Sequence, residues 1–98
     1  MKTIKIYETA GAFAENKDIA KKLRQETVLP ALKLGEQIEF DFQGIDGVTQ
    51  SFIHALISEA IRKYRDAAFD NLLYKNANDQ VKEIIRTVYA YMQESLAE

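Results

Sequence analysis

The chain has 98 residues, of which 47% are hydrophobic and 29% are charged, a size that suits one domain over residues 1–98 and cannot hold two independent cores. It contains no cysteine, which excludes disulfides, thiolate metal sites and a cysteine nucleophile. The 13 basic and 15 acidic residues give a net charge of −2, and this balance disfavours nucleic acid as a partner.

The first half of the chain alternates between strand and helix patterns. Polar and apolar residues alternate over residues 3–7, which predicts a strand with one buried face, and an extra edge strand is expected around residues 10–14. A helical pattern follows over residues 16–34, and Pro30 should bend this helix or start a new turn because it has no amide hydrogen. Residues 37–42 alternate again and predict the second core strand.

The second half continues with a helix over residues 50–65, a strand over residues 71–75 and a helix over residues 78–96. Strands separated by long helices predict parallel pairing through right-handed crossovers. We therefore expect a small three-layer α/β domain, with a short, mainly parallel sheet and helices on both faces. The expected core consists of Ile4, Ile6, Ile38, Phe40, Phe42, Phe52, Leu56, Leu72, Val81, Ile85 and Val88.

The side chains that carry catalysis in other proteins are scattered here. His54 is the only histidine, and none of the residues one helical turn from it is a carboxylate that could complete a metal site. Asp41, at the end of the second strand, and Asp46, in the following loop, could approach each other as metal-binding carboxylates do. Alternatively, Asp41 accepts hydrogen bonds from loop amides. We expect no enzyme activity, no metal and no cofactor.

The most suggestive local feature is the helix start around Thr49 and Ser51. Two hydroxyls lie there at the N-terminus of a helix that follows the carboxyl end of a strand, a place that favours an anion or a phosphorylated side chain. Ligand sites of α/β domains also commonly lie there. The alternative is that both residues are ordinary N-caps.

A resemblance to a known family lies in residues 39–52, which read EFDFQGIDGVTQSF. This segment resembles the hydrophobic-Asp-Phe-x-Gly-Val…Ser-Phe signature of the bacterial STAS-like domain family, which is related to the STAS domains of anti-sigma factor antagonists. In STAS domains proper, a serine at this helix start is phosphorylated and partner binding is then lost. Alignment on Asp41 puts Thr49 and Gln50 in place of the usual Asp-Ser pair, and Ser51 one position beyond.

The resemblance implies a non-catalytic regulatory module that binds a protein partner, such as a histidine-kinase-like ATPase in bacterial signalling. The regulatory or partner surface that it implies consists of Asp41, Asp46, Thr49, Gln50, Ser51 and Phe52. The alternative is a small-molecule or nucleotide sensor that binds an anion at the helix start after the second core strand. No signal peptide and no apolar run of about 20 residues is present, so we expect a cytoplasmic protein that contacts no membrane.

Overall fold

The computed structural model describes residues 1–97 and the side chains of residues 1–94. It contains a sheet of three parallel strands. The strands are β1 (Lys2–Lys5), β3 (Ile38–Asp41) and β5 (Leu72–Lys75), and β3 lies in the middle. In their register Ile4 is opposite Phe40, which in turn is opposite Tyr74. The predicted parallel pairing is confirmed, and each predicted strand is one to two residues longer than the observed one.

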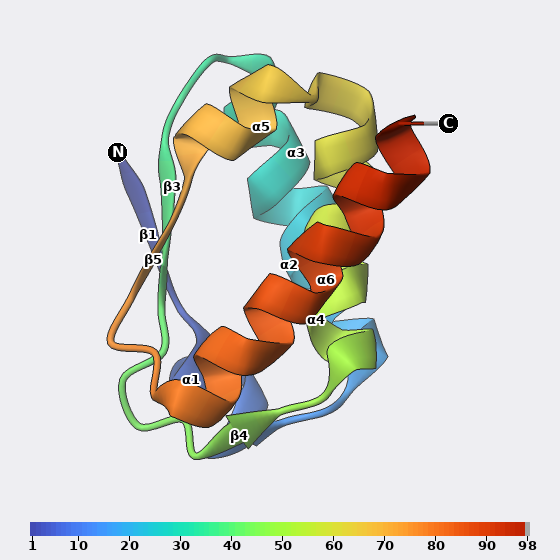
Figure 1. The fold of residues 1–98 in the computed structure, drawn as a ribbon. Helices are drawn as coiled ribbons and strands as arrows, with labels where there is room; N and C mark the ends of the chain where they lie inside the picture. Colours follow the sequence, from blue (N-terminus) through green and yellow to red (C-terminus); the bar gives the residue numbers. More distant parts are fainter. Residues whose placement is uncertain (98) are drawn as a thin grey trace.

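The helices lie on one side of this sheet (Figure 1). The largest of them are α2 (Lys17–Leu23), α4 (Gln50–Tyr64) and α6 (Asp79–Ala97). Ile4 and Phe40 are buried on the covered face, whereas Thr3, Lys5 and Lys75 on the opposite face are exposed. The α/β class is confirmed, but the layers are simpler than expected, with helices on one face only. Because apolar and polar residues alternate along β1, only one of its faces requires cover.

Several short elements complete the fold. These are α1 (Ile6–Ala10), β2 (Phe13–Ala14), a π-helical segment (Arg24–Val28), α3 (Leu29–Lys33), β4 (Gly47–Val48) and α5 (Asp66–Asn71). The edge strand expected around residues 10–14 is present as β2, but it pairs in parallel with β4 in a separate sheet. The chain resumes α-helical winding at Leu29, which places Pro30 in the first turn of α3, where its missing amide hydrogen costs little.

The hydrophobic core lies between the sheet and the helices, and every residue of the expected core is buried. Helix α4 occupies the centre, since it packs against both α2 and α6. Its buried residues are therefore not confined to one stripe, and they include Ile53, Ile57 and Ile61, which the expected core did not contain. A helix that is apolar on most of its sides is typical of such a central position.

The middle strand offers the sharpest test of this core. Phe40 is fully buried, so Phe40→Ala should lower the free energy of unfolding by about 3–5 kcal/mol in urea denaturation. Leu34, which is 75% exposed, provides the control, and Leu34→Ala should change it by less than about 0.5 kcal/mol. Similar losses in both variants would contradict the assignment of the buried sheet face.

Candidate functional site

The candidate site begins with the loop of residues 42–49, which connects β3 to α4 at the carboxyl ends of the strands. In Figure 1 this end of the sheet lies at the bottom, with α1, β4 and the start of α6. The loop is tied to the segment around β2, because the amide of Asp46 donates to the carbonyl of Ala12 at 2.7 Å and the amide of Thr49 donates to that of Ala14 at 3.0 Å.

The first turn of α6 and the residue before it hold the loop from the other side. The amide of Val48 donates to Oε1 of Gln80 at 3.0 Å, and Nε2 of Gln80 donates back to the carbonyl of Val48 at 3.3 Å. Nδ2 of Asn78 donates to the carbonyl of Asp46 at 2.9 Å, while its Oδ1 caps α6 by accepting from the amide of Val81. The loop therefore has a fixed shape, since its backbone groups are bonded on both sides.

Asp41 serves as a structural link. Its Oδ1 accepts from Nδ2 of Asn76 and from the amide of Gln43, both at 3.0 Å, which joins the ends of β3 and β5. The bond from Asn76 and then the bond from Gln43 lower the pKa of the Asp41 carboxyl, and the charges of Lys75 and Lys5 act in the same direction. Of the two interpretations of Asp41, the geometry favours acceptance of loop hydrogen bonds.

At the start of α4, some side chains are hydrogen-bonded or buried and others are exposed. Oγ1 of Thr49 accepts from the amide of Phe52 at 3.1 Å, so Thr49 is the N-cap of the helix. Phe52 is fully buried, which confirms its place in the expected core and shows that it is not part of the expected partner surface. Gln50 and Ser51, in the first turn, are exposed, as is Asp46 in the loop.

Two aromatic rings that the sequence did not assign to the site pack on the glycines of the loop. A Cβ at Gly47 would lie 2.9 Å from the ring of Phe13, and a Cβ at Gly44, where φ is +85°, would lie 3.0 Å from the ring of Tyr7. Both positions thus require glycine for this close approach. The two rings are each 51% exposed, and both pack on the loop that carries Asp46.

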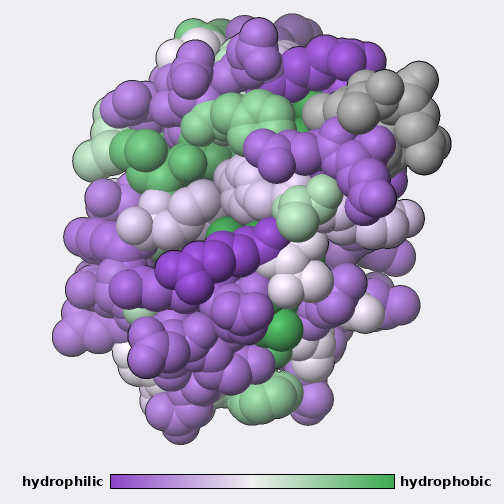
Figure 2. Space-filling view, in the orientation of Figure 1, coloured by the Kyte–Doolittle hydropathy of each residue, from purple (hydrophilic) through white to green (hydrophobic). Residues whose placement is uncertain are grey.

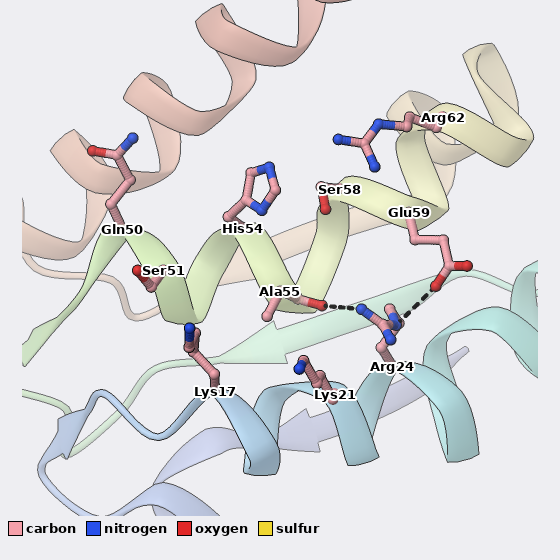
Figure 3. Close-up of a pocket in the computed structure, with 10 residues that line it drawn as sticks. All are labelled: Lys17, Lys21, Arg24, Gln50, Ser51, His54, Ala55, Ser58, Glu59 and Arg62. Atoms are coloured by element: carbon pink, nitrogen blue, oxygen red, sulfur yellow. Dashed lines mark hydrogen bonds and ion pairs between the residues drawn. The ribbon is translucent and has the colours of Figure 1, made fainter.

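A groove of about 640 Å³ runs between α2 and α4, and Figure 3 shows the residues that line it. We call it the α2–α4 groove; it is lined by Lys17, Lys21, Arg24, Gln50, Ser51, His54, Ala55, Ser58, Glu59 and Arg62. The basic residues of this groove were not singled out from the sequence. The spacing of Lys17, Lys21 and Arg24, four and then three residues, was a usable signal, because it puts these three on one side of a helix.

His54 lies at the edge of this groove and is half-buried. Burial, followed by the nearby charge of Arg62, lowers the pKa of its imidazole, and its ring meets that of Tyr91 edge-on, with 6.2 Å between the centroids. Among the residues that the structure describes, no three of the types His, Cys, Asp and Glu are grouped so that they could hold a metal ion. Within the same residues, no helix combines the length and the apolar character required to cross a bilayer.

The two hydroxyls at the start of α4 predict different stability effects. Thr49→Ala removes the N-cap and should lower the free energy of unfolding by about 1 kcal/mol. Ser51→Ala, in the exposed first turn, should change it by less than about 0.5 kcal/mol. Urea denaturation of both variants checks this, and an equal effect would contradict the distinct roles of the two residues.

Asp41 predicts a pH dependence of stability. Because the folded state lowers its pKa, the ionised carboxylate stabilises the fold above the ordinary carboxyl pKa of about 3.9, and this contribution disappears as the pH falls further. Asp41→Asn should therefore be less stable than wild type at neutral pH, by a margin that narrows in acid. Thermal melts from about pH 7 to about pH 3 measure this margin, with the exposed Asp46→Asn as control. A constant margin would contradict the role of the charge.

The family model described as STAS-like domain of unknown function (DUF4325) matches residues 20–82, which include β3, the loop of residues 42–49, α4 and β5. No curated protein and no solved structure gives a significant match. Since the family match covers well over half of the chain, this protein belongs to the family of STAS-like domains of unknown function.

Proposed function

We propose that this domain is a non-catalytic regulatory module that binds a protein partner with the surface around the loop of residues 42–49. We call this surface the docking end and define it as Tyr7, Phe13, Asp46, Gln50 and Ser51. The observation that carries the proposal is the pair of half-exposed rings held against the glycines of the loop. Aromatic side chains of this kind are the usual anchors of protein interfaces.

The docking end is also rigid. Asn78 and Gln80 bond the loop from one side, and the carbonyls of Ala12 and Ala14 bond it from the other. A surface that is already ordered loses less conformational entropy when a partner binds. Hydrophilic side chains cover most of the face seen in Figure 2. Among the described side chains, Tyr7 and Phe13 are two of the five large hydrophobic residues that are exposed, and both pack against the fixed loop.

The resemblance to STAS-like proteins suggests the partner and its regulation. We propose a histidine-kinase-like ATPase as the partner and Ser51 as the regulated residue. A phosphate on Ser51 would add up to about two negative charges at a helix N-terminus, where negative charge is favourable, and Lys17 points toward Ser51 (Figure 3). The fold would therefore tolerate the modification while the charge of the docking end changes.

The proposal is tested with an ATPase of this type encoded near the gene, in a calorimetric titration. Phe13→Ala and Ser51→Asp should each weaken binding by about tenfold or more, because they remove an anchor or introduce a charge at the interface. Each has a matched control far from the docking end. Leu34→Ala removes another exposed apolar side chain, and Gln93→Glu adds a negative charge at an exposed position of α6.

Both controls should bind like wild type, and all four variants should keep its melting temperature within a few degrees. Wild-type affinity in Phe13→Ala and Ser51→Asp would place the interface elsewhere. Failure of the wild-type domain to bind the ATPase would reject this class of partner.

A further inference from the structure

The α2–α4 groove concentrates positive charge in a chain whose net charge is −2. Lys17, Lys21, Arg24 and Arg62 bring four cations to it, and Glu59 is the only carboxylate in its lining. The cations come from two separate helices, and in Figure 3 Lys17 and Lys21 extend from α2 toward α4. Such a convergence of like charges is unfavourable for the isolated domain, and a bound anion would relieve it.

The single carboxylate does not neutralise the groove. Glu59 is engaged by Arg24, whose Nε lies 3.0 Å from its Oε2 and whose Nη1 donates to the carbonyl of Ala55 at 3.2 Å. This pair is anchored, since the side chain of Arg24 is only 16% exposed. Among the residues whose side chains are described, none of Lys17, Lys21 and Arg62 forms an ion pair. Three cations are therefore available to a ligand.

The chemistry of the lining indicates what kind of anion fits. Lysine and arginine are hydrogen-bond donors only, and the sole hydrophobic side chain of the lining is that of Ala55. A peptide would need acceptors for its own amide hydrogens and pockets for apolar side chains, which this groove hardly provides. A phosphate chain consists of acceptors and negative charge, and it matches a surface of donors.

The length of the groove argues against a single phosphate group. Ser51 and Arg62 are 11 residues apart on α4, which corresponds to about 16 Å along a helix axis. A volume of about 640 Å³ is within the range for small-molecule sites. Because the lining contains no aromatic ring other than that of His54, it offers little for stacking a nucleobase.

From these observations we propose that the α2–α4 groove binds a small ligand with two or more linked phosphate groups, recognised through its phosphates. The site differs from the helix N-terminus of α4, where Thr49 already occupies the amide of Phe52. The groove shares Gln50 and Ser51 with the docking end, but the cations that build it lie outside that surface, so ligand binding and partner binding can be tested with different variants.

His54 provides a direct reporter of the ligand. It is the only histidine of the chain, so its ring signals in a proton NMR spectrum identify themselves. It faces Arg62 on its own helix and Tyr91 on α6, and Lys21 lines the same groove from α2. Burial and then the charge of Arg62 lower the pKa of His54; a bound polyphosphate should offset the positive charge, and the pKa should rise on binding.

The experiment titrates the full chain with inorganic triphosphate, ATP, GTP, inorganic phosphate and a glutamate-rich peptide, and measures calorimetry and the His54 pKa. Triphosphate, ATP and GTP should bind with similar affinity and raise the pKa, whereas inorganic phosphate should bind at least about tenfold more weakly. Equal affinities identify the phosphate chain as the recognised part, and tighter binding of one nucleotide identifies a nucleotide as its source. Absence of saturable binding by all three, or a preference for the peptide, would overturn the proposal.

Paired variants locate the site. Lys21→Gln with Arg62→Gln removes two cations from the groove and should weaken triphosphate binding by about tenfold or more. Lys33→Gln with Lys63→Gln removes two exposed cations outside it and should have little effect. Equal weakening in both pairs would show general attraction to positive charge and would overturn the site. If the groove variant does not fold, amide shifts of the wild-type protein decide: changes confined to α2 and α4 support the site, and dispersed changes overturn it.

Discussion

The burial of α4 is the constraint on which the rest of this domain depends. The helix touches α2 and α6, and its residues Phe52, Leu56, Ile57 and Ile61 are fully buried. Because its neighbours hold α4 along its length, its first turn projects from a fixed position, and the flank that it presents beside α2 forms one wall of the groove. The docking end and the α2–α4 groove are thus both consequences of where one helix is packed.

The sheet explains why the helices must be packed in this way. Its polar face carries the ion pair of Lys75 and Glu39 at 3.3 Å. No second layer of helices packs on that face. All the helices then compete for one apolar face, and those that do not fit directly against it must pack on one another. Tyr74 and Tyr89 are partly buried at the edge of the core, and their hydroxyl oxygens, 2.6 Å apart, satisfy each other.

The periodicity of the sequence was sufficient to predict the three core strands, their parallel pairing and the core residues around Phe40, because each rests on a repeated local pattern. It could not separate Ile6 from the preceding strand, since a helix as short as α1 has no period of its own. Helices were also expected from the sequence on both faces of the sheet. The alternating pattern of β1, which exposes Lys5 on one face, already indicated that this face needs no cover. From the sequence, Phe52 was assigned both to the core and to the partner surface, and only the packing of α4 shows that it belongs to the core alone.

Contacts between distant parts of the chain account for most of what was missed at the candidate site. The local sequence does not predict that Phe13 packs on Gly47, or that Gln80 bonds both the amide and the carbonyl of Val48. The basic groove was hidden for a similar reason, because its two walls are separated by about 30 residues of sequence and meet only when α2 packs on α4.

The bonds from Asn76, Asn78 and Gln80 determine when the loop can reach its final shape during synthesis of the chain. A ribosome releases the chain from its N-terminus, so β1, β3 and the loop of residues 42–49 emerge well before the residues that hold that loop in shape. Strands β1 and β3 can pair while the loop is held only by its bonds to Ala12 and Ala14, and the loop acquires its final form only when the start of α6 has emerged. A nascent chain therefore cannot present the mature surface to a partner until the start of α6 has emerged and bonded the loop.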